Sequence, residues 1–568
     1  MNFIFKNLKP YKKELILGPT FKLCEAIIEI SLPIILSHII NDFSSVVKTN
    51  YTFLCLFLLS LVLIAFGSSI SCQYMAAKTS QNFGKSIRKN FFEKLSTLSA
   101  NQLENFSSAS LTNRFTNDIG NLELAVALLI RLVIRVPFIF IGSLLMIFLL
   151  NKTISIIVLL STIILGIFVF LIFKYSSPIF EKYNLKLDRM LTRLKENLEN
   201  VQLVRGFNMQ HFENKNFEKN NKLLGKNYFK ANFISSLLNP ISTIILDITI
   251  LEILYFTKFN PGNLLIGDLI AIINYISQML TVIIVFSNLV TTYSKAFSSY
   301  NRLNDFFNLN PEFIYGNENT FDNNAIAVKF ENVNFSFSKE TNLFENLNIA
   351  IASGEIIGIV GLTSAGKTTF LNLINRSLDC TSGNIKLFEK SIKDYSFDAL
   401  KENITYISQK PEFFTNSIKE NILLGKEYSP HSFDYALQNS DSKEFIERFT
   451  EKENTIIYNN AQNLSGGQKQ RISLARAFIK PPKILILDTV TSAFDLKTEA
   501  NIMNNIYNYS KQNNITTFIA SQKTSTLKKC DKILVLDNFK IKGFDTHENL
   551  LNSSKLYQSL YKMQERNR

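Results

Sequence analysis

Two glycines, a lysine and a threonine stand at fixed spacing in Gly361-Leu-Thr-Ser-Ala-Gly366-Lys367-Thr368, which fits the pattern G-x-x-x-x-G-K-[ST]. An apolar run that favours a strand, Ile356–Val360, precedes it, and a run that favours a helix follows it. Glycines let the backbone wrap closely around phosphates, and free N–H groups at a helix N-terminus attract the anion. The pattern predicts a nucleotide site in which Lys367 contacts the β- and γ-phosphates and the Thr368 hydroxyl binds Mg²⁺.

A carboxylate ends a second apolar run, Lys483-Ile-Leu-Ile-Leu-Asp488. A buried strand that finishes in an aspartate suits a Mg²⁺-associated carboxylate in a fold of this class. An ordinary strand that ends at a turn would give the same pattern. The phosphate-binding pattern elsewhere in the chain favours the magnesium interpretation.

A third polar run lies between the first two and precedes the helical pattern "KQRISLARAF". A serine and two glycines just before a helix offer N–H groups and a hydroxyl to an anion, but the spacing alone does not make this a phosphate site. The run consists of Leu464, Ser465, Gly466, Gly467 and Gln468.

Length and composition favour a membrane part joined to a soluble part. The 568 residues exceed one ordinary domain, and 46% of them are hydrophobic while 19% are charged. The mean hydropathy of +0.09 is low for a chain that lies wholly in a membrane. The five cysteines are scattered and form no CxxC pair, so neither a disulfide framework nor a zinc site is indicated.

Six apolar stretches are long enough for helices that cross a hydrocarbon core of about 30 Å, which takes about 20 residues. Helices are the expected form because backbone groups cannot go unpaired in lipid. The first apolar stretch is too long for a cleavable signal. The six stretches are Leu15 to Ile39, Thr52 to Ala77, Leu122 to Leu150, Thr153 to Ser176, Phe233 to Phe256 and Leu264 to Val290.

The loops between these stretches alternate between short and long. Among the loops, the long ones, 78–121 and 177–232, carry most of the lysines and arginines, and each short loop carries one lysine. Apolar residues at helical spacing in Ser86–Leu98 and Leu187–Val204 predict helices that continue well beyond the bilayer. The positive-inside rule places the long loops and both termini in the cytoplasm. This placement accounts for much of the net charge of +14, so no nucleic-acid partner is expected.

Seven ionisable residues fall in or near the predicted spans. Such residues usually face the interior of a helix bundle or a water-filled cavity. They could line a substrate path, or they could pair with one another between helices. They are Glu25, Glu29, Glu123, Arg131, Arg135, Asp247 and Glu252.

The pattern of the chain changes after the sixth span. Residues 301–325 are polar and aperiodic and are expected to form a linker between a membrane domain, 1–300, and a soluble domain, 326–568. Short β-type runs such as "IAVKFENVNFSF" alternate there with helical patterns, which predicts an α/β domain.

The region Ile326–Gln564 resembles the nucleotide-binding domain of ATP-binding cassette (ABC) transporters, and the LSGGQ run is highly specific for that family. With the six spans, the whole chain resembles a half-transporter of the exporter type. The resemblance implies a six-helix membrane domain with long cytoplasmic extensions followed by an α/β P-loop domain. It also implies a second half-transporter chain as partner, with each ATP held between one chain's phosphate loop and the other chain's LSGGQ.

The resemblance also implies roles for single residues at positions that match the family's motifs. The resemblance implies that Phe337 stacks on adenine, that Gln409 senses Mg²⁺, and that Asp495 ends the loop Ser492–Asp495 running between two sites. Segments near Asn105–Asn117 and Gly206–Phe217 match the helices that couple the two domains. The implied Mg²⁺ residues are Thr368, Gln409 and Asp488. The implied ATP-binding residues are Phe337, Gly361, Thr363, Ser364, Ala365, Gly366, Lys367, Thr368, Thr369 and Gln409.

Two catalytic positions depart from the family pattern. Thr489 stands where the family has the glutamate that polarises the attacking water, and threonine has no carboxylate for that task. Gln522 is the best-aligned residue where the family has the switch histidine, and none of the four histidines falls in that stretch. The combination resembles one chain of a heterodimeric exporter, with a slow site of its own and an intact LSGGQ for its partner.

Alternative interpretations remain open from the sequence. One is a homodimeric exporter with unusual but active sites, and another is an ATP-binding regulatory or channel-like membrane protein. A drug, a lipid or a peptide would each suit such a helix bundle as substrate. The expected location is a bacterial plasma membrane, among its lipids.

Overall fold

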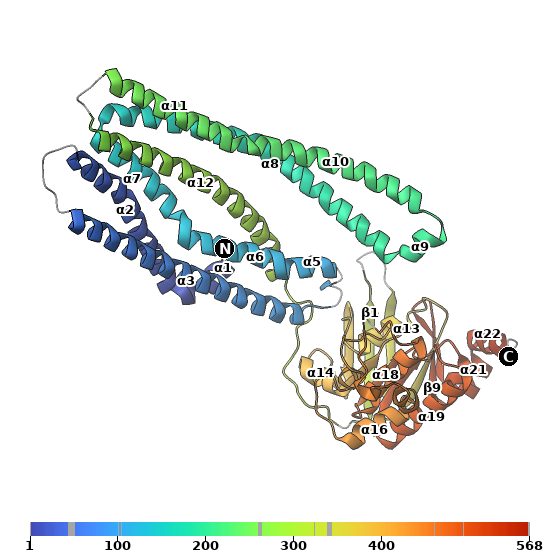
Figure 1. Cartoon of the computed structure of the whole chain (residues 1–568). Helices are drawn as coiled ribbons and strands as arrows, with labels where there is room; N and C mark the ends of the chain where they lie inside the picture. The colour runs from blue at the N-terminus through green and yellow to red at the C-terminus, as the bar shows by residue number, and fades with distance from the viewer. Residues whose placement is uncertain are drawn as a thin grey trace. The chain divides into compact units, whose positions relative to one another are not determined.

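The computed structural model describes residues 2–43, 51–99, 102–103, 105–259, 264–322, 324–337, 343–458, 461–491 and 493–565 (Figure 1). The chain divides into two compact units. The membrane unit comprises Met1–Thr97 and Asn105–Asn310, and the sheet unit comprises Leu98–Glu104 and Pro311–Arg568.

The membrane unit is helical. Within the described residues, six helical stretches are long and apolar enough to cross a membrane, and each overlaps one of the predicted spans. The prediction of six spans is thus confirmed, and the chain is an integral membrane protein. The helices are α1 (Asn2–Leu8), α2 (Lys12–Phe43), α3 (Tyr51–Thr97), α5 (Ser108–Asn113), α6 (Ile119–Leu128), α7 (Arg135–Leu150), α8 (Lys152–Glu199), α9 (Val201–Gly206), α10 (Gln210–Ser236), α11 (Leu238–Phe259) and α12 (Ile266–Phe307), with a short 3-10 turn, η1 (Lys9–Tyr11), after α1.

Several of these helices are much longer than a bilayer is thick. Helix α8 has 48 residues, which is about 72 Å at about 1.5 Å per residue, against a hydrocarbon core of about 30 Å. It lies beside α10 and α11 (Figure 1). The helical periodicity in the long loops therefore predicted their structure correctly.

The third span is not a uniform α-helix. Two π-helical turns, η2 (Arg114–Asp118) and η3 (Leu129–Val133), interrupt it. Pro137 lies just beyond η3 and has no N–H to donate to the carbonyl four residues earlier, which is a common cause of such breaks. Turns of the π type occur often at functional sites.

Most of the ionisable side chains near the spans pair within the bundle. Arg135 on α7 donates to Glu29 on α2 at 2.8 Å, and Arg88 on α3 donates to Glu123 on α6 at 2.7 Å. Glu25 pairs with Lys22 on its own helix. Interhelical pairing thus explains Glu29, Glu123 and Arg135.

Helix α12 continues through 301–307, a stretch whose polar composition predicts no helix. Leu303 and Phe306 are fully buried, and the Phe306 ring stacks on Phe91 with centroids 4.3 Å apart. Arg302 Nε donates to Asp118 at 2.9 Å. These contacts within the membrane unit stabilise the last two turns of the helix.

The sheet unit contains the β-strands. They are β1 (Ile326–Phe335), β2 (Phe344–Ala352), β3 (Ile356–Val360), β4 (Ser382–Leu387), β5 (Lys390–Ser391), β6 (Ile404–Ile407), β7 (Ile484–Asp488), β8 (Thr516–Ala520), β9 (Lys532–Asp537) and β10 (Lys540–Asp545). Its helices are α13 (Lys367–Ile374), α14 (Phe397–Asn403), α15 (Ile418–Leu423), α16 (Pro430–Asn439), α17 (Lys443–Glu447), α18 (Gly466–Phe478), α19 (Leu496–Gln512), α20 (Thr524–Leu527), α21 (His547–Ser553) and α22 (Lys555–Glu565), with a short 3-10 turn, η4 (Lys452–Asn454), before α18.

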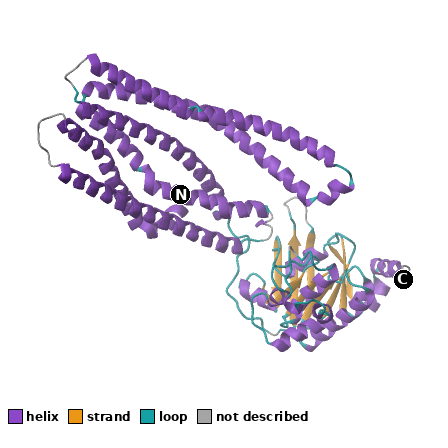
Figure 2. Ribbon diagram, in the orientation of Figure 1, coloured by secondary structure: helices purple, strands orange, loops and turns teal. Residues whose placement is uncertain are grey.

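The strands form an antiparallel sheet in the order β2-β1-β4-β5 and a mostly parallel sheet in the order β10-β9-β3-β8-β7-β6 (Figure 2). Every residue of β3, β7 and β8 is buried, as expected for strands covered on both faces. Because β3, β8, β7 and β6 are parallel, their carboxyl ends meet at one edge. The α/β prediction for this part of the chain is confirmed.

Candidate nucleotide site

Four loops that carry predicted site residues leave the carboxyl edge of the parallel sheet. The loop after β3 begins at Gly361, and the loop after β7 begins at Thr489. Gln522 follows β8, and Gln409 follows β6. In open α/β sheets, ligands bind outside the carboxyl ends of the strands. The strand order therefore brings residues that are up to 161 positions apart in sequence to one edge.

Two positions of the phosphate loop, Gly361 and Gly366, require glycine. Gly366 has a φ of 99°, in the left-handed region, and a Cβ there would lie 2.6 Å from the Phe539 ring. A Cβ on Gly361 would lie 2.3 Å from the carbonyl oxygen of Leu536. The loop therefore stays narrow and presents backbone N–H groups at the N-terminus of α13.

Lys367 lies inside this loop. Its Nζ donates to the carbonyl oxygens of Gly361 at 2.8 Å and Leu362 at 2.9 Å. Burial lowers the pKa of Lys367, and the nearby Asp488 carboxylate acts in the opposite direction. An anion at this place would stabilise the ammonium, so the lysine suits a phosphate ligand.

Asp488 accepts hydrogen bonds from three hydroxyl groups. Thr368 Oγ1 lies 2.8 Å from Asp488 Oδ2 and Tyr406 Oη lies 3.2 Å from it, while Thr489 Oγ1 lies 3.1 Å from Oδ1. Burial is the main cause of a raised pKa for Tyr406, so its phenol stays neutral and donates. Sequence reasoning missed Tyr406, because a tyrosine in a short strand is typical of a core residue.

The oxygens of Thr368 and Asp488 fit a magnesium ion. Mg²⁺ prefers oxygen ligands and is usually held by one or two carboxylates together with substrate phosphates. Across the part of the chain that the structure describes, no group of three or more His, Cys, Asp or Glu side chains could hold a metal by itself. Gln409 is exposed, and its carbonyl oxygen lies 3.5 Å from Gln470 Nε2.

Thr489 has an unusual backbone. Its φ is 54°, which is an outlier for a β-branched residue, and its N–H donates to the carbonyl of Ala520 on β8 at 3.1 Å. Strain of this kind persists where the surroundings impose it and is common at functional sites. The side chain placed there offers a hydroxyl and no carboxylate.

Gln522 is exposed, and the backbone around it is held on both sides. Ser521 N–H donates to the carbonyl of Ile359 on β3 at 3.1 Å. The carbonyl of Gln522 accepts from Gln564 Nε2 on α22 at 2.7 Å. This second contact joins the loop to the C-terminal helix, and no sequence motif indicated it.

The other residues predicted to bind ATP are either exposed to solvent or lie in or next to the phosphate loop. Phe337 is 64% exposed and packs edge-on against Phe335, with ring centroids 5.0 Å apart. Thr363 and Ser364 are exposed, Thr369 is half-buried, and Ala365 is buried. Ser364 also has a left-handed φ of 65°.

The LSGGQ run forms the N-terminus of α18. Ser465 is the N-cap, and Ser465 and Gln468 bond reciprocally in a capping box, with Ser465 N–H donating to Gln468 Oε1 at 2.9 Å. Leu464 is buried, whereas Ser465 and Gly466 are exposed. The Ser465 hydroxyl accepts from Gln468 N–H and keeps its own O–H for another acceptor.

The loop that includes Asp495 packs against this helix end. A Cβ on Gly467 would lie 3.2 Å from the carbonyl oxygen of Ala493. Asp495 caps α19 by accepting from Thr498 N–H at 3.2 Å, and the hydrogen bonds with Thr498 lower the pKa of Asp495. Ser492 lies outside the described residues.

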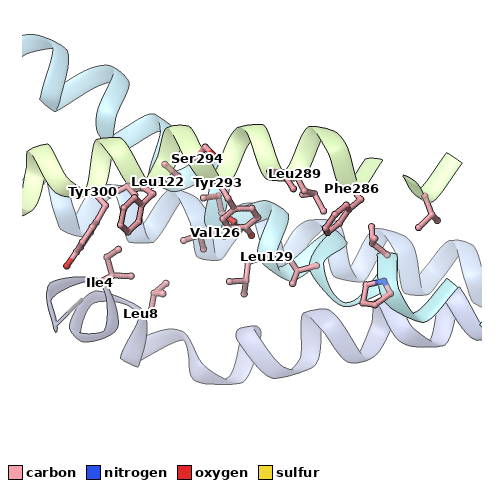
Figure 3. Close-up of a pocket in the computed structure, with 18 of the residues that line it drawn as sticks. Ile4, Leu8, Leu122, Val126, Leu129, Phe286, Leu289, Tyr293, Ser294 and Tyr300 are labelled. Atoms are coloured by element: carbon pink, nitrogen blue, oxygen red, sulfur yellow. The ribbon is translucent and has the colours of Figure 1, made fainter. Parts of the chain in front are cut away.

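An apolar pocket of about 1410 Å³ lies in the membrane unit (Figure 3). Residues of α1, α3, α6, η3, α7 and α12 line it, and none of its lining side chains is charged. Figure 3 labels Ile4, Leu8, Leu122, Val126, Leu129, Phe286, Leu289, Tyr293, Ser294 and Tyr300.

Comparisons with known proteins match both units. Residues 15–283 match the ABC transporter transmembrane region, and residues 344–492 match the ABC transporter family model. The chain is 30% identical, over 98% of its length and 97% of the relative's, to the uncharacterized ABC transporter ATP-binding protein YfiB of Bacillus subtilis. It is 27% identical to the putative multidrug export ATP-binding/permease protein YgaD of the same species, over 99% and 98%.

A solved structure has the same fold. A bacterial Atm1-family ABC exporter with ATP bound superposes with a TM-score of 0.81 at 20% identity, over 99% of both chains. The fold, the two family matches and the full-length relative agree with one another. The chain therefore belongs to the ABC transporter family, as an ATP-binding half-transporter with one membrane region and one ATP-binding domain.

Proposed function

We propose that this chain is one subunit of a heterodimeric ABC exporter. In this proposal it binds ATP at a site of its own that hydrolyses slowly, and it lends its LSGGQ run to a competent site in the partner chain. The observation that carries the proposal is the side chain of Thr489, next to Asp488, where the family has a catalytic glutamate.

The Thr489 hydroxyl cannot act as the missing carboxylate. In the structure it donates to Asp488 Oδ1, so it is already committed to that carboxylate. A missing general base typically costs about 10²–10⁴-fold in rate, which is roughly 3–5 kcal/mol of barrier. This is large enough to separate a slow site from an ordinary one.

The groups expected to bind ATP are retained. Lys367 and the narrow loop around it suit the phosphates, and Phe337 is exposed for stacking on adenine. Thr368, Asp488 and Gln409 would hold Mg²⁺. When bound, the ion would neutralise charge on the phosphates. Retained binding groups with an altered base support a site that holds ATP rather than one that has lost it.

Features of the membrane unit support a location in the cell and a class of substrate. The lysines and arginines of the long loops favour cytoplasmic termini in a bacterial plasma membrane. The uncharged lining of the apolar pocket suits a lipid-soluble drug or a lipid better than a polar peptide.

The experiment is to identify the nucleotide that stays on this chain. The purified complex, with the ABC chain that it captures, is incubated with Mg²⁺ and 8-azido-ATP labelled at the α-phosphate. It is then crosslinked and separated into subunits. We expect mainly uncleaved triphosphate on this chain, and no label after Lys367→Ala. Diphosphate as the main product on this chain would contradict the slow site.

The alternative is a homodimeric exporter with unusual active sites. It requires another group to position the water, and Gln522 and Ser521 are the candidates at this edge of the sheet. Under this alternative the chain alone would turn over ATP at a near-normal rate, and Lys367→Ala would abolish that rate.

A further inference from the structure

Helix α22 ends with a side chain that holds the loop carrying Gln522. Gln564 Oε1 accepts from Thr524 N–H at 2.8 Å and from Thr524 Oγ1 at 2.9 Å. Gln564 Nε2 donates to the carbonyl of Gln522 at 2.7 Å. One amide therefore makes three hydrogen bonds to the three-residue segment that contains the predicted phosphate contact.

The helix that carries Gln564 is anchored in the sheet unit. Tyr557 is fully buried, and its hydroxyl lies 2.7 Å from His547 Nδ1 on α21. Leu556 and Leu560 pack against the same buried core. The anchored half of α22 thus fixes where Gln564 can reach.

The loop is held from α19 as well. Glu499 is 6% exposed and pairs with Lys523, and it accepts from Thr526 Oγ1 at 2.8 Å. These bonds act on the residues that follow Gln522. The Gln564 bond acts on the Gln522 backbone itself, so Gln564 has the more direct effect on where the Gln522 side chain points.

We propose that Gln564 is a positioning residue of the ATP site, which acts by fixing Gln522 against the γ-phosphate. This inference rests on the proposed function, in which Gln522 takes the switch position of a site that retains ATP. It adds a contribution from the C-terminal helix, so that the docking of α22 controls how long ATP stays on this chain.

The experiment measures release of nucleotide from this chain within the co-purified complex. The complex is loaded with labelled 8-azido-ATP or 8-azido-ADP, chased with unlabelled nucleotide, and crosslinked at intervals, and the label on this subunit is followed. We expect Gln564→Leu to release the triphosphate about tenfold faster, because a Gln522 that is no longer held in place loses its hydrogen bond to the charged γ-phosphate. Release of the diphosphate, which has no γ-phosphate, should not change.

Four further variants test whether Gln564 acts through Gln522. Gln564→Glu keeps an acceptor for Thr524 but loses the donor to Gln522, and we expect intermediate release. Gln522→Ala should accelerate triphosphate release, and adding Gln564→Leu to it should change nothing more. Met563→Leu, at an exposed position of α22 next to Gln564, should behave as wild type.

Two results would overturn the inference and differ from a failure of the proposed function. If Gln522→Ala accelerates release of triphosphate but Gln564→Leu does not, Gln564 has no positioning role. If Gln564→Leu accelerates release of both nucleotides equally, its role is merely structural. If Gln522→Ala has no effect, the proposed phosphate contact itself is wrong and the inference falls with it.

Discussion

Thr489 combines a left-handed backbone conformation with a β-branched side chain at the end of a fully buried strand. The backbone conformation is held by the bond from its N–H to Ala520 on the neighbouring strand. The same geometry would hold another side chain at the same place. The identity of residue 489, rather than the position of its backbone, is therefore what limits hydrolysis in our proposal.

Restoring the two altered groups should raise hydrolysis at this site. We expect Thr489→Glu with Gln522→His to increase cleavage of the nucleotide crosslinked to this chain by at least tenfold, because a base and a phosphate contact are returned. The measurement is the ratio of diphosphate to triphosphate on this subunit of the complex.

The control for that variant is Thr489→Gln with Gln522→His. Glutamine has the length of glutamate but accepts no proton, so cleavage should stay near the wild-type level. An unchanged ratio in the glutamate variant would count against the proposal that residues 489 and 522 limit the rate.

At the residue scale, the sequence predicts positions that follow a motif and misses those that depend on tertiary contact. Gly361 and Lys367 are predictable because the spacing of their motif has few other uses. Asp488 is predictable only beside that motif, since an ordinary strand can end in the same way. Tyr406 and Gln564 are not readable, since a tyrosine in a strand and a glutamine in a polar helix occur everywhere.

Helix packing in the membrane unit depends on close approach between α2 and α12. A Cβ on Gly267 of α12 would lie 2.3 Å from the backbone oxygen of Ser37, and Gly267 N–H donates to Asn41 Oδ1 at 2.9 Å. Ser37 also donates to Asp268 at 2.6 Å. The backbones therefore touch at this point, and only glycine leaves room.

The close approach predicts opposite outcomes for two glycine substitutions. Gly267→Ala should destabilise the membrane unit by about 1–3 kcal/mol, because overpacking forces the helices apart. Gly166→Ala on α8 meets nothing within 4 Å and should be neutral or slightly stabilising. Thermal unfolding in detergent compares the two, and equal midpoints would show that the α2–α12 contact does not limit stability.

At the element scale, long apolar runs with basic loops between them predict the six spans, since few soluble structures have that pattern. The π-helical turns are not predictable beyond the hint from Pro137, because they depend on how the third span packs. The helical continuation through 301–307 depends on Arg302 and Phe306 finding partners in the same unit.

At the scale of the whole molecule, the two units differ in the ligands that they could bind. The membrane unit offers a large apolar pocket and pairs most of its buried charges internally. The sheet unit presents a phosphate loop and, at the N-terminus of α18, the exposed residues Ser465 and Gly466. In our proposal this capped helix end contacts the ATP that the partner chain holds.

The most direct test of the heterodimer is ATP turnover in lipid by the purified chain alone and by its complex with the ABC chain that it captures. We predict little turnover alone and robust turnover in the complex, and Ser465→Ala in this chain should lower the turnover of the complex although Lys367 is intact. Robust turnover by the chain alone would contradict the proposal and establish an active homodimer.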